Sequence, residues 1–247
     1  MNRTVCITGG SRGIGRDLAI AFANAGYSVF AGARTESGVE TAARGIRFVR
    51  MDARRDDDHA GLVETAVAET GRLDCYINNA GVSAWRPVIE IDEEFLEDML
   101  STNLKSAFWG SKRAALALSE GGTIINISSL AAKRGTPNNS AYCAAKFGMT
   151  GLTQALAKEL GPKGIRVNAL CPVLVRTPGL IEALSDPTSP AKGDPEGFLA
   201  AFASSQSALG RLPTGAEVAA MALYLDSPAA SAISGQSINV DCGVLPQ

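Results

Sequence analysis

The chain has 247 residues, of which 46% are hydrophobic and 19% are charged, and its formal net charge at pH 7 is -2. This length and composition predict one large globular domain. The small net charge and scattered Lys and Arg residues argue against a nucleic-acid-binding surface. No apolar run reaches the roughly 18 residues needed to span a bilayer. With no leader-like segment before Thr4, we expect a cytoplasmic protein without membrane attachment.

The first predicted element is a strand over Thr4–Thr8, followed by a glycine-rich turn and a helix over Arg16–Ala25. Gly9, Gly13 and Gly15 allow the backbone to turn tightly and to approach a ligand closely. The helix start presents unpaired N–H groups and the positive end of the helix dipole to a phosphate. A glycine-rich turn alone is often only a turn. Its position between a strand and a helix, at the start of an alternating chain, predicts dinucleotide binding.

A second strand, Ser28–Ala33, is followed by Arg34. In a dinucleotide-binding fold the end of this strand meets the adenosine ribose, where an acidic residue would accept a hydrogen bond from the free 2′-hydroxyl. No acidic residue stands there. Arg34 and Arg12 offer planar guanidinium groups that suit a 2′-phosphate. The alternative is two solvated surface arginines.

The third and fourth predicted strands also end in residues that suit a cofactor. The third covers Ile46–Met51 and stops at Asp52, which could accept a hydrogen bond from an adenine amino group. A helix over about 57–70 follows. The fourth strand, Leu73–Ile77, runs into Asn78-Asn79-Ala80-Gly81, where small residues permit contact with a flat ring and asparagine amides tie strand ends together. Taken alone, this segment is equally typical of a turn.

A long helical stretch is predicted over 92–118, with Asn103 inside it. Asparagine is mildly unfavourable in a helix, so this residue needs a specific reason for its position. One reason is a local kink that holds water near a catalytic group. The other is a hydrogen-bonded contact between helices.

The most informative segment follows the apolar strand Thr123–Ser128. Tyr142 and Lys146 are four residues apart, so they project from the same face of a predicted helix. An ammonium within about 4–6 Å favours the phenolate and lowers the pKa of a tyrosine from its usual value near 10. Ser129, at the strand end that faces this helix, could then hydrogen-bond a substrate oxygen whose proton Tyr142 handles. Most Tyr-x-x-x-Lys pairs are a half-buried tyrosine beside a solvated lysine, so the pair needs its context.

The remaining chain completes an alternating pattern. A sixth strand over 165–170 leads to the segment 172–178, and weak periodicity with frequent Pro, Gly and Ser over about 178–210 predicts a mobile substrate lid. A helix over about 214–226 precedes a last strand, 237–240. We therefore predict an α/β fold, a Rossmann-like doubly wound seven-stranded parallel sheet in a single domain over 1–247.

No metal site is predicted. The five cysteines are widely spaced in apolar surroundings, which indicates reduced, buried thiols. The single histidine, His59, follows Asp56-Asp57-Asp58. We interpret this cluster as a solvated helix start, since acidic residues stabilise the positive end of a helix dipole.

Taken together, these motifs resemble the short-chain dehydrogenase/reductase family over essentially the full length of the chain. They occur in the family's order and spacing, including the 13-residue step to Tyr142 that selects Ser129 over Ser128. The resemblance implies an NAD(P)-dependent oxidoreductase in which Tyr142 is the general acid/base and Ser129 orients the carbonyl or alcohol. Lys146 would bind the nicotinamide ribose and lower the tyrosine pKa, and Asn103 would support a water-linked proton relay.

The same resemblance implies a set of cofactor-binding residues from the ends of the first, second, third, fourth and sixth strands. These are Gly9, Ser11, Arg12, Gly13, Ile14, Gly15, Arg34, Asp52, Ala53, Asn79, Ala80, Gly81, Tyr142, Lys146, Pro172, Val175 and Thr177. NADP(H) is the preferred cofactor, with NAD(H) as the alternative. The family often has glycine where this chain has Val173, which narrows the pocket on the nicotinamide side or shifts its loop.

The small-molecule substrate is expected to be a mid-sized, largely apolar secondary alcohol or ketone. The residues predicted to contact it are Ser129, Tyr142, Trp85, Ala131, Asn138, Val173 and Leu174, with Ala84 beside them and Leu180, Ile181, Leu184, Phe198 and Phe202 from the lid. The first alternative is a 3-oxoacyl-[acyl-carrier-protein] reductase. Such reductases tend to carry basic residues near the active-site entrance for the acidic carrier protein. Lys163 suits this role, whereas Glu120 is acidic where a basic residue would help. The second is a non-catalytic dinucleotide-binding sensor. Family resemblance and apolar helix faces near 103–118 and 147–160 also predict a homotetramer.

Overall fold

The computed structural model describes residues 2–36, 38–39 and 43–246. Seven strands form one sheet in the order β3-β2-β1-β4-β5-β6-β7, and every neighbouring pair is parallel. The predicted seven-stranded parallel sheet is therefore confirmed. Its strands are β1 (Thr4–Thr8), β2 (Ser28–Ala33), β3 (Ile46–Arg50), β4 (Leu73–Asn78), β5 (Leu118–Ile127), β6 (Arg166–Pro172) and β7 (Ser237–Val240).

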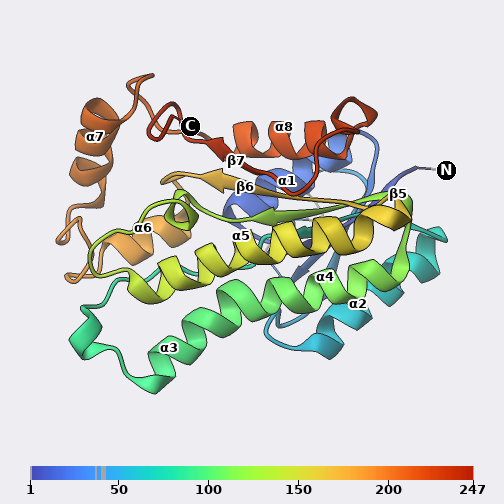
Figure 1. Cartoon of the computed structure of the whole chain (residues 1–247), viewed down its shortest axis with the longest axis horizontal. Helices are drawn as coiled ribbons and strands as arrows, with labels where there is room; N and C mark the ends of the chain where they lie inside the picture. Colours follow the sequence, from blue (N-terminus) through green and yellow to red (C-terminus); the bar gives the residue numbers. More distant parts are fainter. Residues whose placement is uncertain (1, 37, 40–42, 247) are drawn as a thin grey trace.

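Helices cover both faces of the sheet (Figure 1). On one face lie α1 (Gly13–Asn24) and α8 (Gly215–Asp226), and on the other lie α2 (Asp56–Thr70), α4 (Ser106–Ala117) and α5 (Ser140–Leu160). Successive side chains of a strand point to opposite faces, so each buried strand supplies two cores. In β1, Val5 and Ile7 join the core under α1 and α8, whereas Cys6 joins the core under α2 and α4.

The helical stretch predicted over 92–118 is interrupted. It divides into α3 (Glu93–Leu100), a π-helical turn over Ser101–Lys105 and α4. Asn103 lies within the π-helical turn, which is a local irregularity of the kind that one of its two sequence interpretations offered. The following strand begins at Leu118, five residues before the predicted Thr123. Leu118 is apolar and pairs with Leu73 of β4, although the exposed Glu120 follows it in the strand.

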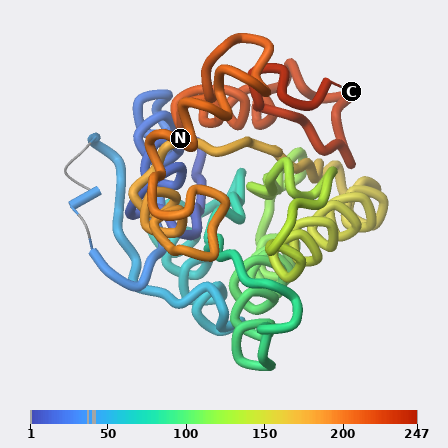
Figure 2. Tube along the Cα trace, turned by 90° about the vertical axis from the view of Figure 1, so that its left-hand side faces the viewer, coloured from blue at the N-terminus to red at the C-terminus, as the bar shows by residue number. Residues whose placement is uncertain are grey.

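The predicted lid contains two helices, α6 (Pro178–Leu184) and α7 (Pro195–Gln206). Each begins with proline in its first turn after a capping side chain, since Thr177 accepts from the N–H of Leu180 and Asp194 from that of Gly197. Figure 2 views the molecule from the end that carries this segment, drawn in orange. Trp85 joins Leu184 and Leu199 in a small apolar cluster beneath it.

The interpretation of His59 as a solvated residue is wrong. Its side chain is fully buried under the first turn of α2. Acidic residues flank it in the chain and the periodicity of α2 is weak, so no local pattern indicates that position 59 faces the sheet. Across the described part of the chain, no helix is both long and apolar enough to cross a membrane.

Candidate active site

A cleft of about 1470 Å³ opens at the carboxyl ends of the strands. Ligands of parallel α/β sheets bind at this edge, because the connecting loops carry chemically active residues there. The residues predicted for catalysis and cofactor binding all line this one cleft, and so do the substrate contacts predicted outside the lid, apart from Ala84. The set comprises Gly9, Ser11, Arg12, Gly13, Ile14, Gly15, Arg34, Asp52, Ala53, Asn79, Ala80, Gly81, Trp85, Asn103, Ser129, Ala131, Asn138, Tyr142, Lys146, Pro172, Val173, Leu174, Val175 and Thr177.

Ser129, Tyr142 and Lys146 come together where β5 meets α5. Ser129 follows the end of β5 and accepts a hydrogen bond from the N–H of Ala131 at 3.1 Å, which begins a short 3₁₀ turn. Tyr142 lies in the first turn of α5 and Lys146 one turn later. Lys146 Nζ lies 5.6 Å from the centre of the Tyr142 ring and donates to the carbonyl of Ile127 at 3.0 Å. The amine is therefore anchored to the strand end beside the phenol.

Burial is the largest influence on both titratable groups. It raises the pKa of Tyr142 to about 12, while a side-chain hydrogen bond with Ser129 acts to lower it. It lowers the pKa of Lys146 to about 8. The expected lowering of the Tyr142 pKa by Lys146 is not found, because burial disfavours both charged forms and the amine bonds the Ile127 carbonyl instead.

Asn103 is fully buried within its π-helical turn. Its Oδ1 accepts from the N–H of Val82 at 3.1 Å, and its Nδ2 donates to the carbonyl of Met99 at 3.0 Å. A Cβ placed on Gly81 would lie 2.9 Å from Asn103 Oδ1 and 3.7 Å from Lys146 Nζ. Gly81 therefore leaves open the space between the amide and the lysine.

The glycine-rich turn has the shape that a pyrophosphate requires. Gly9 has a φ of +66°, and a Cβ on Gly15 would lie 2.1 Å from the carbonyl oxygen of Gly9. Arg12, at the N-cap of α1, provides no side-chain hydrogen bond, so the first N–H groups of the helix lack this cap. Asn79 secures the turn by donating to the carbonyls of Thr8 at 2.9 Å and Gly9 at 3.2 Å. The cradle is built from backbone and fits a dinucleotide phosphate.

Basic side chains line the part of the cleft formed by the predicted cofactor-binding residues. Arg34 is exposed at the end of β2, and Arg12 forms a 3.9 Å ion pair with Glu182 of α6. Arg50 and Arg54, which the sequence interpretation missed, also line the cleft. Their position at the end of β3 was the available signal. Arg54 engages both oxygens of Asp52, and this hydrogen bonding lowers the pKa of the carboxyl.

The substrate end is apolar on its walls and basic at its rim. Leu180, Phe198 and Phe202 line the cleft as predicted, but Ile181 and Leu184 do not. They belong to the apolar cluster with Trp85, because one face of α6 must pack against the core. The predicted contact Ala84 lines an adjoining pocket instead.

Two basic side chains also line this end, of which the sequence interpretation missed Arg134. Arg134 lies five residues after Ser129 on the same loop, and Lys192 stands in the lid with a φ of +48°. Leu174, next to Val173, has a φ of +38°, a region that residues other than glycine seldom adopt. Val173 itself packs with Leu130 and Val244 beside the cleft.

Comparisons with known proteins agree with this geometry. The profile of a protein family described as "Enoyl-(Acyl carrier protein) reductase" matches residues 9–245. An L-2,3-butanediol dehydrogenase of Corynebacterium glutamicum is 35% identical, over 99% of this chain and 99% of its own. A 3-oxoacyl-[acyl-carrier-protein] reductase of Chlamydia trachomatis serovar D is 34% identical over 99% and 98%. The crystal structure of a variant of the actinorhodin polyketide ketoreductase with NADPH superimposes with a TM-score of 0.90 at 30% identity, covering 98% of this chain and 97% of its own.

Proposed function

Because the chain belongs to the short-chain dehydrogenase/reductase family and is an NAD(P)-dependent oxidoreductase acting on CH–OH groups, we propose that it uses NADP(H) to interconvert a secondary alcohol and a ketone on a mid-sized, largely apolar substrate. The observation that carries the proposal is the meeting of Ser129, Tyr142 and Lys146 in the wall of one cleft. A non-catalytic sensor would not need to keep this set together.

Tyr142 is proposed as the proton donor and acceptor. In carbonyl reduction its hydroxyl donates a proton to the substrate oxygen, and in alcohol oxidation its phenolate accepts that proton. Ser129 orients the same oxygen by hydrogen bonding. The Lys146 ammonium stabilises the phenolate and holds the nicotinamide ribose, and the bound cofactor supplies or accepts the hydride. Asn103 would position the far end of a proton relay that passes Lys146.

NADP(H) is the proposed cofactor because of the charges at the end of β2. Ala33 stands where an acid would select NAD(H), while Arg12 and Arg34 flank the cleft. The backbone at Gly9 and Gly15 would hold the pyrophosphate. A structural neighbour was solved with NADPH, which supports the preference.

A second candidate is a 3-oxoacyl-[acyl-carrier-protein] reductase. Arg134 and Lys192 at the rim of the cleft favour it, since a basic rim suits an acidic carrier or its phosphate-bearing arm. The apolar walls at Phe198 and Phe202 favour an apolar substrate held by buried surface. Both candidates use the same catalytic group.

Turnover with each cofactor over a panel of acyl thioesters, cyclic ketones, sugars and hydroxy acids separates these candidates. We expect kcat/KM to be about tenfold or more higher with NADPH than with NADH, because a charge-assisted bond contributes about 1.5–3 kcal/mol before solvent screening. Ala33→Asp should reverse the preference. Equal kcat/KM for the two cofactors in the parent protein would count against the NADP(H) assignment. A gain of about tenfold on adding a carboxylate or phosphate to the substrate would favour the second candidate.

A further inference from the structure

His59 is a buried titratable side chain that the proposed chemistry does not use. It is fully buried and both ring nitrogens are engaged, Nδ1 with the hydroxyl of Tyr76 at 2.7 Å and Nε2 with the carbonyl oxygen of Ala53 at 2.7 Å. Tyr76 is also fully buried, in the centre of the sheet on β4. Burying the polar groups of His59 and Tyr76 destabilises the fold unless all of their hydrogen bonds are made.

The partners determine which nitrogen carries the proton. A carbonyl oxygen only accepts, so His59 Nε2–H must donate to Ala53. Nδ1 of the neutral ring is then an acceptor, and the Tyr76 hydroxyl donates to it. Burial lowers the pKa of His59, which favours this neutral form. The result is a directed chain of hydrogen bonds from the middle of the sheet to one peptide group in the loop after β3.

That loop forms part of the cleft, through Asp52 and Ala53. Two consecutive residues of α2, Asp58 and His59, hydrogen-bond the backbone of Asp52 and Ala53. Asp58 Oδ2 accepts from the N–H of Asp52 at 2.7 Å, and His59 donates to the carbonyl of Ala53. The Asp52 carboxylate also accepts from the N–H of Arg54 at 3.0 Å. The α2 side chains that hold the loop in this shape do not themselves line the cleft.

We infer that His59, oriented by Tyr76, is a positioning residue for the adenosine half of the dinucleotide. It fixes the Asp52–Ala53 turn against which the adenine is bound. The inference rests on the proposed function, because it assumes that the adenosine lies at the end of β3. Because the turn is already ordered before the cofactor binds, the free energy of binding does not include the cost of ordering it. Loss of the His59 hydrogen bond should therefore weaken cofactor binding.

The test is calorimetric binding of adenosine 2′,5′-bisphosphate, which carries the adenosine half alone. His59→Leu with Tyr76→Phe removes both partners of the His59–Tyr76 hydrogen bond while keeping the core filled, a paired apolar replacement that costs little in folding, and it leaves the Ala53 carbonyl without its donor. We expect the dissociation constant to rise about three- to tenfold, the factor that one hydrogen bond contributes. His59→Gln, whose amide can donate to Ala53 and accept from Tyr76, should restore most of the affinity.

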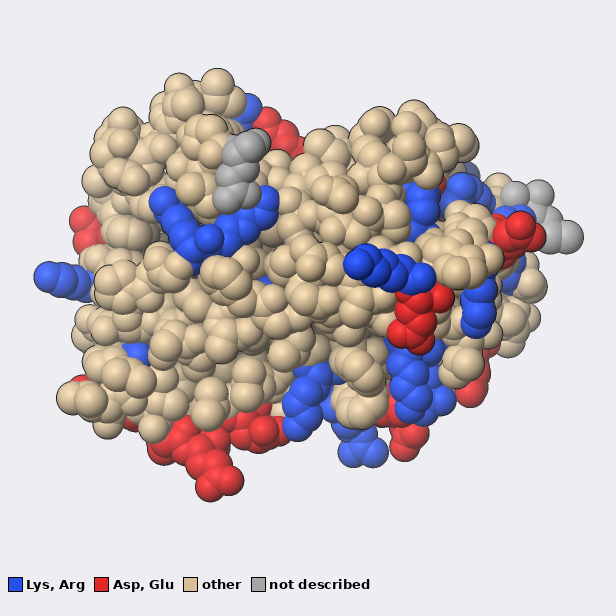
Figure 3. Space-filling view, in the orientation of Figure 1, with Lys and Arg blue, Asp and Glu red and all other residues tan. Residues whose placement is uncertain are grey.

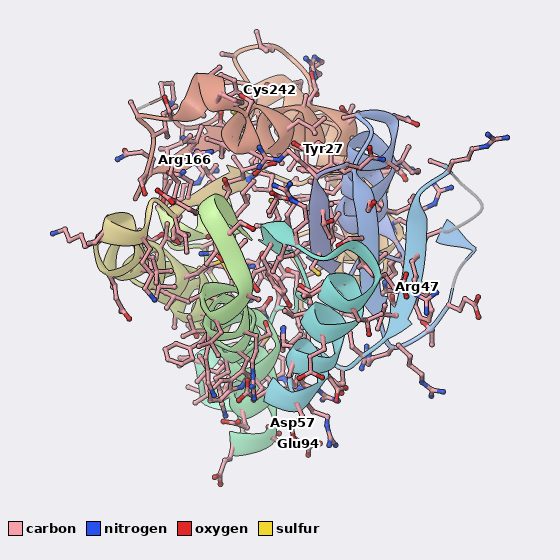
Figure 4. All side chains as sticks on the ribbon, turned by 90° about the vertical axis from the view of Figure 1, so that its right-hand side faces the viewer. Tyr27, Arg47, Asp57, Glu94, Arg166 and Cys242 are labelled. Carbon is pink, nitrogen blue, oxygen red and sulfur yellow. The ribbon has the colours of Figure 1, made fainter. Side chains whose placement is uncertain are left out.

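Tyr27→Phe is the matched control. It removes the 2.8 Å hydrogen bond from Tyr27 to Asp226, a partly buried tyrosine bond on the side of α1 and α8. Figure 4 labels Tyr27 far from Asp57 at the start of α2, the helix that carries His59. We expect parent-like affinity in this variant even if its thermal stability falls.

Two outcomes contradict the inference and are distinguishable. Parent-like affinity in the double variant would show that His59 serves folding only. Failure of the parent protein itself to bind adenosine 2′,5′-bisphosphate would contradict the proposed function, and the positioning role with it.

Discussion

Tyr142 and Lys146 show how one environment acts on two groups in opposite directions. Burial raises the pKa of the phenol to about 12 and lowers the pKa of the amine to about 8, so both neutral forms are favoured. Lys146 Nζ lies 5.6 Å from the centre of the Tyr142 ring.

We predict that kcat/KM for alcohol oxidation increases with pH, because oxidation needs the Tyr142 phenolate as the proton acceptor. Lys146→Met removes the ammonium that favours the phenolate, so the rising limb of the profile should move to higher pH. The measurement is the pH dependence of oxidation at saturating cofactor for both proteins. A limb that stays in place would show that Lys146 does not influence the proton step.

At this scale the sequence was informative for residues in motifs and uninformative elsewhere. The four-residue spacing of Tyr142 and Lys146 predicted that they meet, because helix periodicity determines which side chains share a face. Ser129 was assigned to them by the spacing of the family that the chain resembles. His59 was misinterpreted since its neighbours are acidic and its bonding partners, Ala53 and Tyr76, lie in other elements. Such contacts depend on tertiary structure and leave no local pattern.

At the scale of elements, the π-helical turn between α3 and α4 is the clearest departure from regular structure. An asparagine in a predicted helix pointed to an irregularity, but its π-helical form depends on packing that no local pattern records. The turn places Asn103 where its side chain bonds the backbone at both Val82 and Met99. It therefore links the loop after β4 to the end of α3.

Asn103→Leu should lower the free energy of unfolding by about 1–3 kcal/mol, because the N–H of Val82 would lose its partner. Chemical denaturation measures this change. Ser101→Ala is the matched control in the same turn, since the Ser101 hydroxyl bonds Glu97 at an exposed position, and it should change stability little. An unchanged unfolding free energy in Asn103→Leu would mean that water replaces the amide there. Where both proteins are folded, kcat should also fall in Asn103→Leu if the residue supports the proton relay.

The lid illustrates a different limit of sequence interpretation. The hydrophobic periodicity over 178–210 is weak, so the sequence did not predict the two helices there. Capping residues and first-turn prolines, rather than an apolar stripe, define α6 and α7. The apolar residues are also divided between two roles. Leu180 lines the cleft while packing against the apolar cluster, whereas Leu184 is buried within that cluster. The local pattern could not assign these roles.

For the whole molecule, the alternation of strands and helices was sufficient to predict the sheet, since parallel strands need helical crossovers on both faces. Assembly is a separate question. In Figure 3 the centre of the face that carries α4 and α5 in Figure 1 is uncharged, and charged side chains stand along its lower and right-hand parts. On these helices Phe108, Leu116 and Phe147 are exposed by 50%, 76% and 47%.

We predict a homotetramer, or at least a dimer, in which this apolar face is covered by another copy of the chain. Light scattering at micromolar protein concentration measures the mass directly. Phe108→Glu with Phe147→Glu should lower it, because burying two carboxylates in an apolar contact is costly. A parent protein that is monomeric at this concentration would refute the prediction.

The proposed role of Tyr142 is to transfer the proton during NADP(H)-dependent interconversion of an alcohol and a ketone. Its most direct test compares the parent protein with Tyr142→Phe for NADPH oxidation by a ketone, followed by absorbance, together with NADPH binding to each. We predict that kcat falls by orders of magnitude in Tyr142→Phe while NADPH still binds, because only the hydroxyl is removed. Near-normal turnover in Tyr142→Phe would contradict it.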